Sequence, residues 1–137
     1  MQSAGYSGTP LVQKLGIKPG VAVHALDAPP HYEELLDPLP DGAHILRDHL
    51  SGPSTFIHLF ASERAKLEQH LEGVIKNLEP TGILWISWPK KASGVPTDIT
   101  EDVLRTVCLP TGLVDVKVCA VDATWSGLKF YWRNELR

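Results

Sequence analysis

The run Ile83 to Trp88, Ile-Leu-Trp-Ile-Ser-Trp, is almost unbroken in its apolar character. Strands that are buried on both faces have such runs, and they belong to mostly parallel sheets covered by helices. The run leads directly into the charged, proline-containing segment 89–98. Because ligands of open α/β sheets bind at the loops after the carboxyl ends of the strands, this segment predicts the location of a functional site.

Other strand and helix patterns alternate around this run. The expected strands are 21–26, 55–60, 83–88, 114–121 and 128–132, and the expected helices are 9–16, 31–36, a long one from Ser62 to before Pro80, and 101–109. Residues 43–50 are ambiguous, since two apolar residues there suggest a strand while the flanking charges do not. Residues 1–8, which contain two glycines and two serines, are expected to form a loose arm.

The long helix has the clearest pattern in the chain. Its apolar residues recur at helical spacing and so form one stripe; they are Leu67, Leu71, Val74, Ile75 and Leu78. Ser62 is the expected cap of this helix, and Thr9 and Thr100 are the expected caps of the first and last helices. Glycine at position 16 suits the end of the first helix.

The alternation of strands and helices predicts one domain, residues 1–137, with a three-layer, Rossmann-like α/β fold. The segment 122–127 is too short for a parallel crossover, so the last two strands are expected to form an antiparallel hairpin. A chain of this length buries enough surface to fold without disulfides or metal.

Composition excludes several classes of function. The net charge of -3 and the pI near 6.0 argue against nucleic acid as a partner. No run of about 18 apolar residues is present, so no membrane span or membrane partner is expected. No charged-then-apolar leader opens the sequence, and a cytoplasmic location is expected by default.

The cysteines and histidines do not form a recognisable metal or disulfide pattern. Cys108 and Cys119 are too few for a disulfide framework and are expected to be free, buried thiols. None of the six histidines has the spacing of a metal pair on one helix face, so no metal is expected. His24 and His58 lie in neighbouring expected strands, where a buried, hydrogen-bonded pair is the favoured outcome.

The segment Leu78-Glu79-Pro80-Thr81-Gly82, the strand after it and the final hairpin resemble S-adenosylmethionine-dependent methyltransferases. In that family a strand-helix-strand unit ends in Leu-x-Pro-x-Gly before a central strand, and the sheet finishes with an antiparallel hairpin. The resemblance implies a methyltransferase-like fold.

A resemblance over nearly the whole chain is to a family of short, uncharacterised bacterial proteins, a domain of unknown function. The strings that carry this resemblance are Ala4 to Gly8, Lys14 to Gly20, Trp88 to Gly94, Thr100 to Val103, Val116 to Asp122 and Thr124 to Lys129. This family implies no established substrate or cofactor, and no cofactor is expected here.

The first strand ends in Asp27-Ala28-Pro29-Pro30-His31, a turn without glycine. A nucleotide-binding turn needs glycines for its tight bend and its close approach to the ligand, and prolines lack the N–H donor. Asp48 stands 21 residues after Asp27, a distance at which an acid can hold ribose hydroxyls, but a solvent-facing aspartate is the favoured interpretation. The span from Leu26 to Thr55 is also short for a full methyltransferase, so one strand is expected to be missing.

The loop after the central strand supplies most of the candidate ligand-binding residues. Lys90 and Lys91 can attract phosphate or carboxylate, although two solvated surface lysines are the slightly favoured interpretation. Ser93 and Asp98 lie in the same loop, and Asp27 ends the first strand. The helix start that follows is a poor anion site because Glu101 and Asp102 already occupy its positive end.

Two tryptophans and a serine complete the candidate set. Trp125 and Ser126 lie in the expected final turn, where Trp125 is either an exposed anchor for a ligand or partner or a lid over the core. Trp88 lies at a strand exit, while Trp85 is expected in the core. No Gly-x-Ser-x-Gly elbow is present, and Asp98 and Asp122 are the better acid-base candidates.

Three functions remain open from the sequence. The leading hypothesis is a non-catalytic or minimally active methyltransferase-like domain that binds a small anionic ligand or a protein partner. The second is an enzyme, a methyltransferase or another, whose site uses Lys90, Lys91, Asp98 and Trp125 in one cleft. The third is a structural module that forms a homodimer through the final hairpin.

Overall fold

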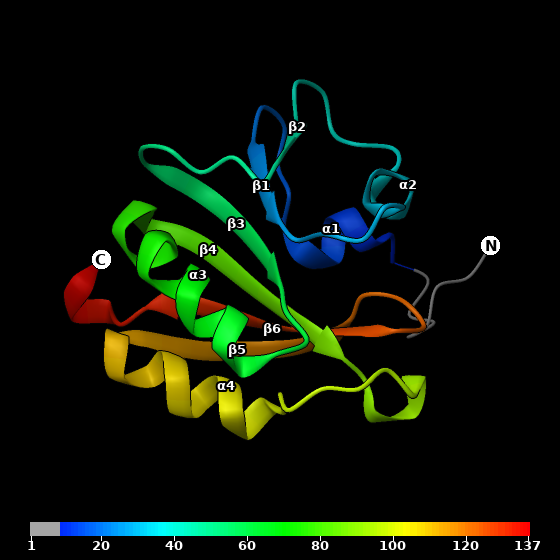
Figure 1. Cartoon of the computed structure of the whole chain (residues 1–137). Coiled ribbons are helices and arrows are strands. Elements are labelled where there is room, and N and C mark those ends of the chain that lie inside the picture. The colour runs from blue at the N-terminus through cyan, green and yellow to red at the C-terminus, as the bar shows by residue number, and fades with distance from the viewer. Residues whose placement is uncertain (1–8) are drawn as a thin grey trace.

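Six strands form one sheet with helices on both faces, as the computed structural model shows for residues 9–137, the part described here (Figure 1). The strands are β1 (Ala22–Leu26), β2 (His44–Arg47), β3 (Ser54–Phe60), β4 (Leu78–Pro89), β5 (Leu113–Ala120) and β6 (Trp125–Trp132). The helices are α1 (Leu11–Leu15), α2 (Tyr32–Leu36), α3 (Arg64–Asn77) and α4 (Glu101–Cys108). The arm expected over residues 1–8 lies outside the described residues.

The strand order is β2-β1-β3-β4-β6-β5, with parallel pairs from β2 to β4 and antiparallel pairs on both sides of β6. The predicted three-layer fold with a final antiparallel hairpin is confirmed. Within it, β6 is inserted between β4 and β5, so the edges of the sheet are β2 and β5. The ambiguous segment 43–50 contributes β2.

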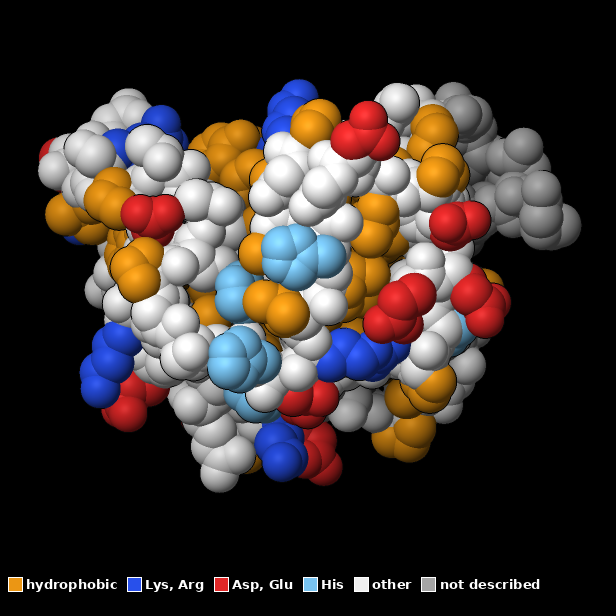
Figure 2. Space-filling model, turned by 90° about the horizontal axis from the view of Figure 1, so that it is seen from above, with side chains coloured by type: hydrophobic (Ala, Val, Ile, Leu, Met, Phe, Trp, Pro, Cys, Tyr) orange, Lys and Arg blue, Asp and Glu red, His pale blue; other side chains and the backbone are white. Residues whose placement is uncertain are grey.

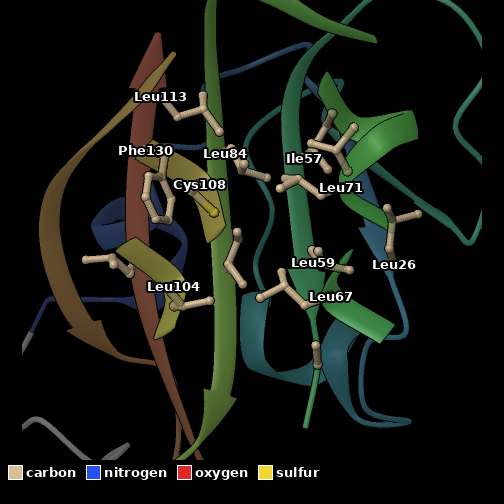
Figure 3. Packing of buried hydrophobic residues seen from close by; sticks show 14 of the residues in the cluster. Leu26, Ile57, Leu59, Leu67, Leu71, Leu84, Leu104, Cys108, Leu113 and Phe130 are labelled. Atoms are coloured by element: carbon tan, nitrogen blue, oxygen red, sulfur yellow. The ribbon is translucent and has the colours of Figure 1, made fainter. Parts of the chain in front are cut away.

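Two apolar clusters hold the layers together. One lies between the sheet and α3 and α4, where Leu67 and Leu71 pack against Ile57 and Leu59, and Leu104 packs beside Phe130 (Figure 3). The other lies on the opposite face, where α1 and α2 bury Leu15, Tyr32 and Leu36 among side chains of β1, β3 and β4. The central strands are therefore covered on both faces, as their apolar runs predict. Within residues 9–137, no helix combines the length and apolar character that crossing a bilayer requires.

The caps of the helices differ in part from the expectation. Thr100 caps α4, since its Oγ1 accepts a hydrogen bond from Val103 N at 3.2 Å. The expected caps Ser62 and Thr9 are wrong, because Glu63 and Pro10 occupy the cap positions of α3 and α1 and neither side chain bonds the helix. Glycine at position 16 ends α1 in the left-handed conformation, with φ 83°.

Two strands begin several residues earlier than the sequence predicts. β4 begins at Leu78, because an irregularity in the β3–β4 pairing between Ser54 and Phe56 accommodates Pro80 and Gly82 inside the strand. β6 begins at Trp125, which shortens the connection of the hairpin to residues 121–124. Glycine is required at position 82, where a Cβ would lie 2.7 Å from a methyl carbon of Leu78.

The expected pair of His24 and His58 is wrong. In the β1–β3 register His24 lies opposite Ile57 and Ala25 opposite His58, so the two imidazoles point to opposite faces of the sheet. Both are buried and hydrogen-bonded, but His24 Nδ1 contacts the carbonyl of His49 at 2.7 Å, whereas His58 contacts Tyr32 and Ser87. Cys108 is buried and Cys119 half-buried, and both thiols are free, as expected.

Replacing Gly127 by alanine should destabilise the fold. A Cβ there would lie 3.1 Å from both Ser87 Oγ and Trp85 Cε3, inside a packed core. We expect Gly127→Ala to lower the free energy of unfolding by about 1–3 kcal/mol, measured by urea denaturation. The matched control is Gly73→Ala in α3, where a Cβ meets nothing within 4 Å and helix propensity should raise stability by about 0.5–1 kcal/mol. Equal effects of the two substitutions would contradict this packing.

Candidate functional site

The carboxyl ends of five strands meet along one edge of the sheet. β1 to β4 run parallel, and β5 has the direction of β4 because both pair antiparallel with β6. Asp27, Asp48, Lys90 and Asp122 follow the ends of these strands and therefore lie along that edge. This is the edge at which ligands bind in open α/β sheets.

Asp27 and Asp48 contact each other at the ends of β1 and β2. The backbone N–H of Asp27 donates to Asp48 Oδ1 at 2.8 Å, and Asp27 Oδ2 lies 2.8 Å from Nε2 of His70 in α3. Both aspartates have positive φ, 55° and 51°. Asp48 is exposed, as the sequence favours, but its carboxylate already binds the first turn.

Beside Asp48 is a shallow hollow of about 290 Å³ lined by Leu26, Asp48, Leu50, Gln69, His70 and Gly73. Histidines and apolar side chains also gather on the face seen from above (Figure 2).

Arg47, at the end of β2, holds the turn after β1. Its guanidinium donates to the carbonyls of Ala28 (3.2 Å), Pro29 (2.8 Å) and Pro30 (3.2 Å). It also makes a bidentate pair with Glu33 of α2, at 2.8 and 2.7 Å. Hydrogen bonds from Arg47 hold the pKa of the Glu33 carboxyl well below its ordinary value. This role of Arg47 could not be predicted from the sequence, because no motif marks an arginine that binds backbone carbonyls.

A buried hydrogen-bonded chain lies beneath α2. His58 Nδ1 is 2.7 Å from the Tyr32 hydroxyl, and His58 Nε2 is 2.7 Å from Ser87 Oγ. All three residues are inaccessible to solvent. The spacing is that of a hydroxyl, a base and an orienting group, but all three side chains are enclosed by apolar residues of the described chain. The chain therefore satisfies buried polar groups and joins α2 to β3 and β4.

One side chain of the loop 89–98 closes a turn within the loop, and two others fasten the loop to the start of α3. Ser93 Oγ donates to the carbonyl of Lys90 at 2.6 Å. Thr97 Oγ1 donates to the carbonyl of Ser62 at 2.6 Å, and Asp98 Oδ1 accepts from Arg64 N at 2.7 Å. Asp98 thus supplies the missing cap of α3 from a distant loop. Ser93 and Asp98, predicted as ligand residues, both bond the backbone here.

The two tryptophans of the candidate set lie on opposite faces of the sheet. Trp88 belongs to the cluster under α3 and α4 and is 7% exposed. Trp125 packs edge-on against Phe60 in the other cluster, with ring centroids 5.0 Å apart. The sequence left Trp125 as either an exposed anchor or a lid over the core, and in the structure it packs as a lid over the core. Because Asp98 caps α3 on the Trp88 side, the single cleft expected for Lys90, Lys91, Asp98 and Trp125 is not formed.

An open groove of about 760 Å³ lies beyond the end of β4, on the Trp88 side. It is lined by Trp88, Pro89, Lys91, Gly94, Val95, Pro96, Thr97, Ile99, Thr100, Glu101, Asp102 and Arg105. Arg105 is bonded to Glu101 (2.9 Å), Asp102 (3.3 Å) and Asp115 (3.1 Å). Among the described residues, Lys91 is the one cation of this lining without an ion pair, and it is exposed.

The remaining candidates at this edge are held by neighbours. Asp122 lies 2.9 Å from His31 Nε2 and accepts from the backbone N–H groups of Thr124 and Trp125. Burial raises the pKa of Asp122, but these hydrogen bonds outweigh it and leave the pKa below its ordinary value. Ser126 pairs in β6 with Trp88 and Ala120. Within residues 9–137, no three His, Cys, Asp or Glu side chains are placed to bind a metal ion together.

Solved structures share this fold. A S-adenosylmethionine-dependent methyltransferase from Aquifex aeolicus matches 88% of this chain and 86% of its own, with TM-score 0.61 and 14% identity. Magnesium protoporphyrin IX methyltransferase from Synechocystis, solved with bound S-adenosylmethionine, matches over 90% and 74%, with TM-score 0.58 and 9% identity. The fibrillarin pre-rRNA processing protein of Methanococcus jannaschii matches over 90% and 69%, with TM-score 0.52 and 10% identity.

These likenesses establish a methyltransferase-like fold, as the sequence predicts. No family model and no curated protein sequence matches the chain. The resemblance to a family of uncharacterised bacterial proteins therefore stays a prediction.

Removing Arg47 should cost more stability than removing another paired arginine. Arg47 bonds three carbonyls in addition to Glu33, whereas Arg64 makes one surface pair with Glu68. We expect Arg47→Ala to lower the free energy of unfolding by about 1–3 kcal/mol, and Arg64→Ala by less than about 0.5 kcal/mol. Urea denaturation measures both. Indistinguishable values would mean that the guanidinium does not hold the turn.

The buried imidazole of His58 should make the fold sensitive to acid. Burial lowers the pKa of His58 to about 3, while an unfolded histidine titrates near pH 6.5. Below that pH the unfolded state therefore binds a proton that the folded state does not, and stability falls as the pH falls. We expect His58 alone to remove about 2 kcal/mol between pH 7 and pH 5. Urea denaturation across this range should show a flatter pH dependence for His58→Gln, and an unchanged slope would contradict the neutral, buried imidazole.

Proposed function

We propose that this chain is a non-catalytic binding domain with a methyltransferase-like fold, which takes a small anionic ligand in the groove beyond β4. The non-catalytic assignment rests on the contact of Arg47 with three carbonyls of the turn after β1. That turn is the place at which a nucleotide-binding fold approaches its ligand most closely.

The chemistry of the turn opposes S-adenosylmethionine. Pro29 and Pro30 have no N–H to donate to the ligand's carboxylate. The carbonyls of residues 28–30 are directed to the guanidinium of Arg47, so a carboxylate would meet acceptors where it needs donors. Asp48, placed to accept from ribose hydroxyls, is already bonded to Asp27 N. Binding would require these contacts to be broken, and their free energy would be subtracted from the affinity.

The composition of the groove beyond β4 supports the binding of a small anionic ligand. Its floor includes Trp88 and Ile99, which are nearly buried, and its rim includes Lys91, Thr97 and Thr100. The flat aromatic floor, the hydroxyls and the cation without an ion pair suit a small carboxylate or phosphate with an apolar body. Glu101 and Asp102 on the same rim are held by Arg105, which reduces their repulsion of an anion.

S-adenosylmethionine should not bind at physiological concentration. Equilibrium dialysis with the radiolabelled compound should give a Kd weaker than about 1 mM, an interaction of less than about 4 kcal/mol. Micromolar binding would overturn the non-catalytic assignment.

Small acids should raise the melting temperature through Lys91. In a thermal-shift screen of carboxylates and phosphates, we expect a hit whose shift is lost in Lys91→Gln. The shift should be kept in Lys66→Gln, a matched change at an exposed lysine of α3. If no compound raises the melting temperature, the proposal of an anionic ligand is wrong and a protein partner is favoured.

A second candidate function is S-adenosylmethionine-dependent methyl transfer. It is favoured by the fold likeness and by the hollow beside Asp48, and dialysis tests it directly. A third is dimerisation through the final hairpin. The edge strand β5 could pair with that of a second copy, but this would bring the Lys117 side chains of the two copies together, and like charges at an edge oppose such pairing.

A further inference from the structure

Three lysines gather on the face of the sheet that faces α1, away from the groove beyond β4. Lys117 of β5 lies directly opposite Lys129 of β6 in the antiparallel register. Like charges in such a pair destabilise a sheet. The end of α1 reaches this place, since a Cβ on Gly16 would lie 4.0 Å from Lys129 Nζ. Lys14 of α1 and Lys117 both act electrostatically on the Cys119 thiol, which places Lys14 near Lys117. The chain has a net charge of -3, so this concentration of positive charge does not follow from composition.

No carboxylate neutralises the cluster. Among the described residues, the ion pairs involve His31, Arg47, Arg64, His70 and Arg105, and none involves Lys14, Lys117 or Lys129. The segment 1–8 contains no Asp or Glu in its sequence. The positive charge of this face is therefore available to a partner.

Lys129 is held in place by aromatic rings. Its Nζ lies 5.0 Å from the centroid of the Tyr131 ring and 5.9 Å from that of Trp85. Cation–π contacts stabilise the ammonium in a half-buried position without neutralising it. The ammonium is thus oriented before any partner arrives, which reduces the entropy lost on binding.

The cluster does not serve to activate Cys119, which lies between Lys117 and the end of the strand. Burial is the larger effect on this thiol and raises its pKa, although Lys14, Lys117 and Lys90 act in the opposite direction. A thiol with a raised pKa is a poor nucleophile at neutral pH. The lysines therefore do not make Cys119 a reactive thiol at neutral pH.

The surroundings of the cluster suit an extended chain. Lys117 is exposed, and Lys14 and Lys129 are half-buried. They border β5, an edge strand whose outer backbone groups pair with no other strand among the described residues. On the opposite side of β5, Val118 is 47% exposed. A strand added beside β5 would place alternate side chains over the lysines and over Val118.

We propose that the β5 edge with Lys14, Lys117 and Lys129 binds an extended peptide of a partner protein, in which acidic and apolar residues alternate. The acidic side chains pair with Lys117 and are attracted at longer range by Lys14 and Lys129, and the apolar ones contact Val118. A second copy of this chain fits less well, because pairing of two β5 strands would bring their lysine clusters together. Regular pairing is limited to Lys117–Ala120, since the register shifts between Asp115 and Lys117.

The probe for this surface is a fluorescein-labelled peptide of alternating Glu and Val, measured by fluorescence anisotropy at low ionic strength. We expect binding that weakens about tenfold in Lys117→Glu, because an attractive charge becomes repulsive. Lys66→Glu makes the same charge change on exposed α3 and should alter the Kd less than about twofold. Because Lys117→Glu replaces a like-charge pair with an opposite-charge one, it should leave the melting temperature equal or higher.

Control peptides and hydrogen exchange test whether binding depends on acidic residues and on strand pairing at β5. A peptide with Lys in place of Glu should not bind, and the amides of Lys117–Ala120 should gain hydrogen-exchange protection with the acidic peptide. Absence of binding, or equal weakening by Lys117→Glu and Lys66→Glu, would overturn the proposal. So would tighter binding of a single-stranded oligonucleotide of equal charge, or binding without protection of β5. None of these outcomes depends on the groove beyond β4, so this proposal and the proposed function can fail separately.

Discussion

The position of the first turn and of α2 depends on one guanidinium. Arg47 is anchored at the end of β2 and receives the carbonyls of residues 28–30 together with the carboxylate of Glu33. This contact fixes α2 against the sheet, and α2 in turn carries Tyr32 into the buried chain with His58 and Ser87. The polar groups of the turn are satisfied by the protein itself, so the turn has no need of a ligand to complete it.

Much of what looks chemically active in the loop after β4 has a structural use. Asp98 caps α3 and Ser93 closes a turn, so the loop is fastened to the helix that follows β3. What remains available is Lys91 above an apolar floor on one side of the sheet, and the lysine cluster beside β5 on the other. In this methyltransferase-like scaffold, the cations that could bind a ligand or partner therefore lie away from the first turn.

The sequence predicts the fold well because its signals are local. The unbroken apolar runs specify β3 and β4, and the stripe of α3 specifies the face that it buries. The features that could not be predicted from the sequence depend on contacts between segments that are distant in the chain. Arg47 reaches residues 14 to 19 positions away, and Asp98 caps a helix 34 positions earlier. The opposite orientations of His24 and His58, and of Trp88 and Trp125, follow from strand register, and a shift of one residue would reverse each.

The most direct test is a crystal structure grown with saturating S-adenosylmethionine. We expect Arg47 to remain bonded to the carbonyls of residues 28–30, with no ligand against the turn. Adenosine lying beside residues 28–30, with the guanidinium displaced, would contradict it.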